Sequence, residues 1–142
     1  MVKLKGKDMK ELVVDATIEN LTQVLEFIDT ELENAECDMK NQVKIDMAVE
    51  ELYVNIAHYA YHDKIGKAQI LFDVDSDNRV IITLIDSGVH YDPLAKDDPD
   101  ISLSAEEREI GGLGIYMVKQ SMDEVLYEYT DGQNKTTIIK NL

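Results

Sequence analysis

The sequence predicts an α+β domain, a two-layer α/β sandwich in which helices pack on one face of a mixed, mostly antiparallel sheet. Segments with apolar residues at helical spacing are the first observation. The second is that short β-branched segments are joined in pairs by the turn-forming stretches DSDN and DGQN. The third is the order of elements: strand, helix, helix, hairpin, helix, hairpin. With 142 residues, the chain fits one domain spanning residues 1–142.

The first half of the chain contains one predicted strand and two predicted helices. Residues 11–16 (ELVVDA) are short and β-branched, which is typical of a strand. Residues 19–36 carry apolar side chains at helical spacing, with Thr17 or Asn20 as the N-cap. Residues 39–61 form a second helix that is apolar on more than one side. We therefore expect this second helix to be the central and most buried one.

The second half contains two predicted hairpins separated by a weakly structured segment and a helix. Residues 87–110 are poor in apolar side chains and contain both prolines and an acidic run. Such a long segment inside a compact domain is either functional or a misassignment, and we interpret residues 92–110 as a mobile lid. The predicted strands and helix are residues 68–74, 79–86, 115–122, 124–130 and 135–141.

Charge and cysteine content restrict the classes of function. The 29 acidic and 14 basic residues give a net charge of -15, which opposes binding to nucleic acid and to anionic membranes. Cys37 is the single cysteine, so an internal disulfide is excluded and the residue is interpreted as a small hydrophobe. The N-terminal stretch lacks the apolar run of a signal peptide, and no 18-residue apolar segment occurs. We therefore expect a cytoplasmic protein.

Three separated segments carry residues with chemistry. EELYVN lies on the second helix, DSG ends a strand, and GGLG opens the last helix. Glu51 and Asn55 are four residues apart, so they share one helix face with His58 and Tyr59. Burying such a polar strip without partners is costly, so we expect it to face a cavity. Each segment alone is also explained by turn geometry or packing.

Taken together, the three segments resemble the GHKL superfamily of ATP-binding proteins. Within it, the chain is most similar to the anti-sigma-factor serine/threonine protein kinase branch, which has a histidine kinase-like ATPase domain. The most specific stretches are DSGVHYDP and GGLGIYMVKQSMDEVLYE, and the resemblance covers residues 11–140. It implies the Bergerat ATP-binding fold, which agrees with the sandwich predicted from periodicity.

The resemblance implies roles for four residues, with ATP and Mg²⁺ as cofactors. Asn55 matches the asparagine that coordinates the Mg²⁺ bridging the ATP phosphates, and a carboxamide oxygen suits this ion. Glu51 matches the general base that takes the proton from a substrate serine. Asp86 matches the carboxylate that accepts a hydrogen bond from the adenine amino group. Gly88 would let the backbone approach the ring.

Further residues match the phosphate loop, the lid and the surroundings of adenine. The GGLG stretch matches a loop whose backbone N–H groups and helix N-terminus receive phosphates. Arg108 would contact phosphate or a partner from the lid, and Thr137 matches a hydroxyl near the adenine. His58 is a candidate phosphate-facing residue, and Tyr91 with Asp92 a candidate closure of the adenine side. The loop residues are Gly111, Gly112, Leu113 and Gly114.

Each assignment has a structural alternative. Glu51 could be a solvated helix residue beside Glu50, and Asp86 a turn residue. Thr137 could be β-branched filler, and Arg108 one half of a surface ion pair. For His58 the alternative is packing or surface exposure, and for Tyr91 with Asp92 it is an exposed turn. In addition, His90 stands where the superfamily usually has a second glycine, which leaves the loop geometry near the nucleotide open.

Three hypotheses about function follow. The first is a serine/threonine kinase that phosphorylates a STAS-domain anti-anti-sigma protein and binds a sigma factor, as the resemblance implies. The second is a non-catalytic interaction module in which ATP sets the lid conformation and hence partner affinity. The third, an ATP-driven clamp, is disfavoured because clamps need further domains. Kinases of the resembled branch often dimerise, so the resemblance also implies that a homodimer can form.

Overall fold

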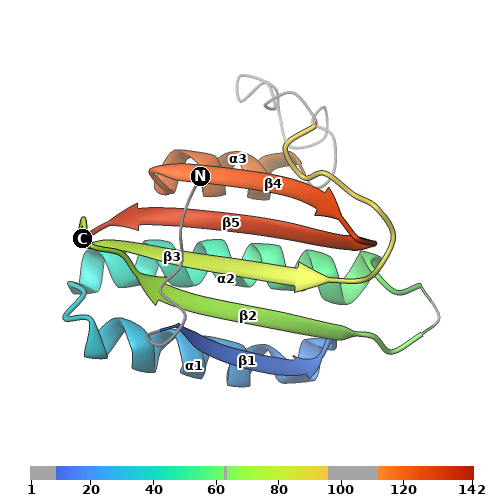
Figure 1. Ribbon diagram of the computed structural model, residues 1–142, viewed down its shortest axis with the longest axis horizontal. Coiled ribbons are helices and arrows are strands. Elements are labelled where there is room, and N and C mark those ends of the chain that lie inside the picture. Colours follow the sequence, from blue (N-terminus) through green and yellow to red (C-terminus); the bar gives the residue numbers. More distant parts are fainter. Residues whose placement is uncertain (1–8, 63, 96–111) are drawn as a thin grey trace.

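The computed structural model describes residues 9–62, 64–95 and 112–142 (Figure 1). The order of elements is the predicted one, and most boundaries lie within two residues of those predicted. A short 3₁₀ turn at Ile18–Asn20 leads into the first α-helix. The elements are β1 (Lys10–Asp15), α1 (Leu21–Asn34), α2 (Met39–Tyr59), β2 (Lys67–Val74), β3 (Arg79–Asp86), α3 (Gly112–Ser121), β4 (Glu124–Thr130) and β5 (Gln133–Asn141).

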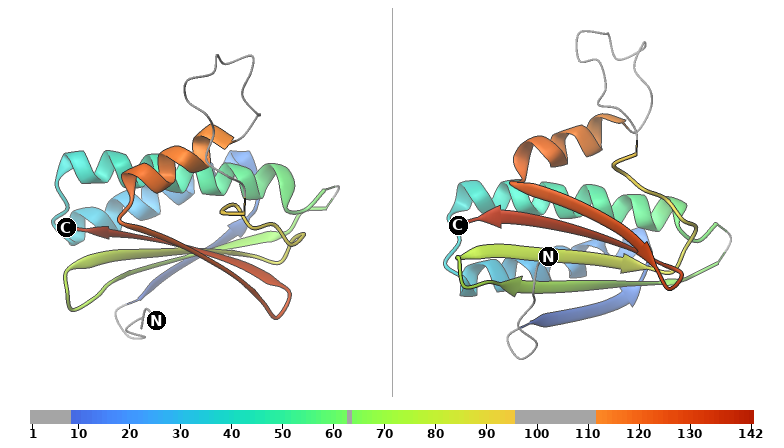
Figure 2. Two further views of the ribbon diagram at one scale, coloured as in Figure 1. Left: turned by 90° about the horizontal axis from the view of Figure 1, so that it is seen from above. Right: turned by 45° about the horizontal axis from the view of Figure 1, so that its top comes forward.

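The five strands of the described part form one sheet in the order β1-β2-β3-β5-β4, and all four pairings are antiparallel. The three α-helices lie together on one face of this sheet (Figure 2). The α+β class and the two-layer arrangement are thereby confirmed. Strand β3 is the middle strand, and seven of its eight residues are buried. Its continuous apolar run VIITLI agrees with that position, because the side chains on both faces of this middle strand are buried.

Helix α2 is the central helix of the layer, between α1 and α3 (Figure 1). Five of its residues are buried, compared with three on α1, as its apolar sides predict. The Tyr53 hydroxyl donates a 2.6 Å hydrogen bond to the Thr17 carbonyl, which ties the helix to the end of β1. The core against the sheet is formed by Ile45, Val49, Leu52, Ile70, Phe72, Ile82, Leu84 and Ile138.

The capping of the first two helices differs from the prediction in one place. Neither Thr17 nor Asn20 caps α1 with its side chain, and Asn20 instead donates to the Asp15 carbonyl. Helix α2 has a regular N-cap, in which Asp38 Oδ1 accepts a 2.7 Å hydrogen bond from the Asn41 N–H.

The turn between β4 and β5 is shorter than predicted. Asp131 and Gly132 both have positive φ, 54° and 76°, as the two central residues of a tight hairpin turn of type I′ require. Gln133 and Asn134 therefore belong to β5 rather than to a four-residue turn. The register places Asn134 directly opposite Asp86 on β3.

Candidate functional site

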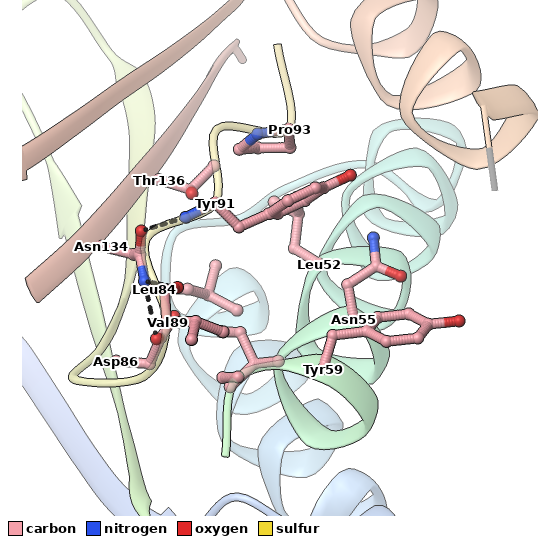
Figure 3. A pocket seen from close by; sticks show the side chains of 12 residues that line it. Leu52, Asn55, Tyr59, Leu84, Asp86, Val89, Tyr91, Pro93, Asn134 and Thr136 are labelled. Atoms are coloured by element: carbon pink, nitrogen blue, oxygen red, sulfur yellow. Dashed lines mark hydrogen bonds between the residues drawn. The ribbon is translucent and has the colours of Figure 1, made fainter. Parts of the chain in front are cut away.

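A pocket lies between α2 and the sheet, at the end of β3 (Figure 3). Its enclosed volume is about 50 Å³, smaller than the roughly 300–1,000 Å³ of typical ligand pockets. Tyr59 and Tyr91 are 60% and 44% exposed, so their side chains have space to move and enlarge it. The lining residues are Leu52, Asn55, Ile56, Tyr59, Ala60, Leu84, Asp86, Val89, Tyr91, Pro93, Asn134 and Thr136.

Asp86 is the buried carboxylate of this pocket and the last residue of β3. Its Oδ1 accepts hydrogen bonds from the Gly88 N–H (2.9 Å) and from Asn134 Nδ2 (3.0 Å). Burial raises the pKa of the Asp86 carboxyl, and these two hydrogen bonds act in the opposite direction. Both hydrogen bonds end on Oδ1, so as far as the structure describes the chain Oδ2 is left for a ligand.

Gly88 allows the loop after β3 to close against the end of α2. A Cβ at this position would lie 2.2 Å from the carbonyl oxygen of Ala60, which only glycine avoids. The next residue, Val89, donates its N–H to that same carbonyl at 2.9 Å. The close backbone approach that requires this glycine is therefore an approach to the protein's own helix, whereas the sequence suggested an approach to a ligand ring.

Glu51 and Asn55 lie one helical turn apart on α2. Asn55 lines the pocket, and Figure 3 shows it across the pocket from Asp86. Glu51 is half-buried, whereas its neighbour Glu50 is exposed. Burial raises the pKa of the Glu51 carboxyl, a hydrogen bond from the Asn55 carboxamide lowers it, and the Glu50 charge raises it. A carboxylate with a raised pKa beside a carboxamide is suited to accepting a proton.

The first turn of α3 lies against Glu51. A Cβ at Gly114 would come 1.9 Å from a Glu51 carboxylate oxygen, so a side chain at this position would displace the Glu51 carboxylate. The backbones of Gly112 and Leu113 form the beginning of α3, where unpaired N–H groups favour an anion. The structure thus brings GGLG and Glu51 together as far as it describes the stretch. Arg108 and Gly111 lie outside the described residues, as does most of the predicted lid.

The remaining predicted residues have different positions. Tyr91 lines the pocket and donates its N–H to Asn134 Oδ1 at 3.1 Å. Asp92 is not among the lining residues, and its Oδ1 accepts from the Leu94 N–H at 2.8 Å. His58 is exposed outside the pocket, with its ring edge-to-face with Tyr59 at 5.8 Å.

Thr137 points away from the pocket. Its hydroxyl pairs with the Thr83 hydroxyl at 3.1 Å on the face of the sheet that carries no helix. Side chains alternate along a strand, so its neighbour Thr136 lines the pocket instead. The prediction was therefore one residue away from the threonine at the site.

Asn134 is a pocket residue that the sequence analysis did not identify. It is 5% exposed, lines the pocket and contacts Asp86, Val89, Tyr91 and Tyr127 through hydrogen bonds. The available signal was the dipeptide Asp-Gly, which is typical of a two-residue hairpin turn and would have placed Asn134 on β5.

The fold agrees with the comparisons with known proteins. The family model of the histidine kinase-like ATPase domain matches residues 14–140, and the chain belongs to this family. The serine-protein kinases RsbW of Bacillus cereus (strain AH820) and of Bacillus anthracis are 32% identical to it over 90 residues. These matches cover 61% of this chain and 56% of the relatives, so the chain spans about half their length.

A solved structure shows the same fold. The crystal structure of the RsbU and RsbW domains of Rv1364c from Mycobacterium tuberculosis matches with a TM-score of 0.67 and 18% identity. The match covers 94% of this chain and 32% of that one. Nearly the whole chain thus corresponds to one part of a larger protein.

The described residues lack two features. No three His, Cys, Asp or Glu side chains of the described ranges lie together as ligands for a metal ion. None of the described helices has the length and apolar content to span a lipid bilayer.

Proposed function

We propose that this chain binds Mg·ATP in the pocket beside Asp86 and transfers the γ-phosphoryl group to a serine or threonine of a partner protein. This proposal rests on one observation, which is that the pocket has two chemically different ends. A buried carboxylate stands at one end, and a carboxamide stands at the other, with a half-buried carboxylate one helical turn before it.

The Asp86 end fits an adenine base. Asp86 lines the pocket with a carboxylate, an acceptor that suits an exocyclic amino group, and the hydroxyl of Thr136 adds a second polar group. Apolar side chains such as Leu52, Ile56 and Leu84 form the walls, as expected for a flat aromatic ligand. Tyr59 and Tyr91 would move aside when the base enters.

The Glu51 end fits the phosphates. ATP would supply the transferable phosphoryl group, with Mg²⁺ neutralising its charge. Asn55 lines the pocket, and its carboxamide oxygen is the group proposed as the ligand for Mg²⁺. The N-terminus of α3 provides N–H groups for an anion within reach of the same place, despite the net charge of -15.

Glu51 acts as the general base in this proposal. Its carboxylate would accept the proton of the substrate hydroxyl while the hydroxyl oxygen bonds to the γ-phosphorus and the bond from that phosphorus to the bridging oxygen breaks, with ADP as the leaving group. The raised pKa of Glu51 brings the carboxyl closer to the working pH. The proton must be accepted by an ionised carboxylate, so the rate should fall on acidification at a higher pH than for an ordinary glutamate.

The partner is proposed from the relatives. The matched Bacillus proteins are named serine-protein kinases, which supports a serine of another protein as the acceptor. We propose a STAS-domain antagonist as the substrate and a sigma factor as the alternative partner, in a partner-switching arrangement. The charge of -15 favours partners with a basic surface, and their association should slow as salt rises.

The test is transfer of labelled phosphate from [γ-³²P]ATP to a serine-bearing STAS-domain protein, with a Ser→Ala version of that protein as the matched control. The proposal predicts Mg²⁺-dependent labelling of the first protein and none of the second. Mg²⁺-dependent ATP binding without any transfer would instead assign the chain as an interaction module whose partner affinity is set by ATP.

A further inference from the structure

The carboxamide of Asn134 uses its full hydrogen-bonding capacity. Its Nδ2 donates to Asp86 Oδ1 at 3.0 Å and to the Val89 carbonyl at 2.9 Å. Its Oδ1 accepts from the Tyr91 N–H at 3.1 Å and from the Tyr127 hydroxyl. A carboxamide offers two donors and two acceptor lone pairs, so the group is saturated. With an exposed fraction of 5%, water does not compete for these bonds.

The orientation of this carboxamide is fixed by the backbone. A backbone N–H always donates and a backbone carbonyl always accepts, so Tyr91 and Val89 together define which side of Asn134 carries the nitrogen. Turning the group over would put NH₂ against the Tyr91 N–H and oxygen against two acceptors, Asp86 and Val89. The Asn134 nitrogen therefore always faces Asp86 (Figure 3).

We propose that Asn134 is a positioning residue that holds Asp86 ionised and oriented as an acceptor, so that the pocket selects a purine with a 6-amino group over one with a 6-oxo group. This inference rests on the proposed function. A donor that cannot reverse stabilises the carboxylate form of Asp86 over the acid. A protonated Asp86 could donate to a 6-oxo group, so loss of the Asn134 donor should weaken the selection.

The end of the β4–β5 hairpin supports Asn134 and the loop that it contacts. The His90 ring stacks on Tyr129 with 4.2 Å between centroids, and lies nearly parallel to Tyr127 at 6.2 Å. Thus His90, where the superfamily usually has a glycine, fastens residues 89–91 to β4. Within the described ranges, the hydroxyls of Tyr61, after α2, and of Tyr127, on β4, are titratable groups whose pKa values the Asp86 charge raises.

The test compares binding of ATP and of inosine triphosphate, which carries a 6-oxo group, between pH 5 and pH 8 by calorimetry. Asn134→Asp keeps the shape of the side chain but removes the donor, and Asn134→Ala removes the whole group. Tyr127→Phe is the matched control, because it removes a bond from the oxygen side and leaves the donor to Asp86 in place. Titration of the nucleotide phosphates is common to all four proteins and cancels in the comparison.

The wild-type chain and Tyr127→Phe should prefer ATP by more than about tenfold, and the preference should shrink to about threefold or less in both Asn134 variants. The pH below which ATP affinity is lost should rise by about one unit in Asn134→Ala, since one charge-assisted hydrogen bond to the carboxylate is gone. It should rise further in Asn134→Asp, where two carboxylates face each other.

An unchanged ATP preference and an unchanged pH profile in the Asn134 variants would overturn the inference. A wild-type chain that binds neither nucleotide would instead overturn the proposed function. If the variants do not fold, a measurement on the wild-type chain still tests the inference. The side-chain NH₂ signals of Asn134 in ¹⁵N NMR should shift as Asp86 titrates, and signals that do not respond would contradict the contact.

Discussion

The two ends of the pocket are built in opposite ways. At the Asp86 end, a carboxylate, a carboxamide and three backbone groups bond to one another from two strands and a loop. At the Glu51 end, both side chains come from one helix, and Asn55 supplies the side-chain hydrogen bond that acts on Glu51. The difference indicates that the first end is fixed before any ligand binds, while the second keeps donors and acceptors available for phosphates, metal and substrate.

The effect of burial on the carboxyl pKa is opposed differently at the two ends of the pocket. At Asp86, two donors oppose the rise in pKa that burial causes. At Glu51, one carboxamide opposes burial and a neighbouring carboxylate adds to it. Asp86 is thus suited to remain an acceptor, whereas Glu51 is suited to take up a proton.

Replacing Glu51 with Gln should give the largest difference between the effect on phosphoryl transfer and the effect on ATP affinity. The amide keeps the shape of the side chain but cannot accept the proton, so phosphoryl transfer should fall by about 10²–10⁴-fold while ATP affinity stays within about threefold. Transfer of labelled phosphate and calorimetry measure the two quantities. Glu50→Gln, one residue away and exposed, should behave as wild type. Full activity in Glu51→Gln would remove this residue from the mechanism.

Replacing Asn55 with Ala should remove Mg²⁺-dependent binding. Loss of a metal ligand should reduce the affinity for Mg·ATP by about 100-fold, since even groups that only support ligands affect metal affinity by about 10–100-fold. Titration with and without Mg²⁺ provides the comparison within one protein. If Mg²⁺ still strengthens ATP binding equally in this variant, the metal must be held by other groups.

Replacing Asp86 with Asn should weaken ATP binding at the fixed end. A charge-assisted hydrogen bond to a buried carboxylate contributes about 1.5–3 kcal/mol, so the affinity should fall by roughly 10–100-fold with or without Mg²⁺. Competition with a fluorescent ATP analogue would measure this. An effect confined to the Mg²⁺ condition would instead associate Asp86 with the phosphate end.

A third carboxylate, Asp46, lies between α1 and α2 away from the pocket and should affect stability alone. Its pKa is raised to about 7 by burial and by the facing Asp29 carboxyl, with Glu50 adding a smaller contribution. The native state then binds the proton more tightly than the unfolded chain, whose ordinary value is 3.8, so stability falls as pH rises from about 4 to 7.

The Asp46→Asn variant should therefore be more stable than the wild type at pH 8, by about 1–2 kcal/mol after allowance for solvent screening, and similar at pH 4. Urea unfolding at the two pH values measures the difference, and ATP affinity should not change. If stability depends on pH in the same way in both proteins, the pKa of Asp46 is not raised in the folded state.

The smallest effect concerns the two threonines of β5. Thr136→Val should lower ATP affinity by about two- to fivefold, because one neutral hydrogen-bonding group is lost at the pocket. Thr137→Val should leave ATP affinity unchanged, since its hydroxyl bonds to Thr83 on the other face of the sheet. The reverse pattern would mean that β5 is shifted by one residue in solution.

The sequence predicted the elements well because their patterns are local. The helical spacing of α2 and the β-branched segments of β2 and β3 specify both type and position. Glu51 and Asn55 were placed on one side of α2 by their spacing alone. Asp86 was selected because its DSG stretch, together with the other two segments, resembles the GHKL superfamily, and the structure places it in the pocket.

The residues that were missed depend on contacts between distant parts of the chain. Reading DGQN as a four-residue turn excluded Asn134 from β5, and a shift of one position put Thr137 at the pocket instead of Thr136, because a strand changes face at every residue. The stacking of His90 on Tyr129 arises only once the β4–β5 hairpin lies beside the loop after β3. Periodicity in a single sequence carries no information about such a contact.

Calorimetric titration of the wild-type chain with ATP, with and without Mg²⁺, is the most direct test of the proposed Mg·ATP site. We expect saturable ATP binding that Mg²⁺ strengthens. The effect of Mg²⁺ should be lost in Asn55→Ala, and the part of the affinity that comes from the adenine base should be lost in Asp86→Asn. Absence of binding at any accessible ATP concentration would contradict it, because neither end of the pocket would then have the ligand for which it is proposed.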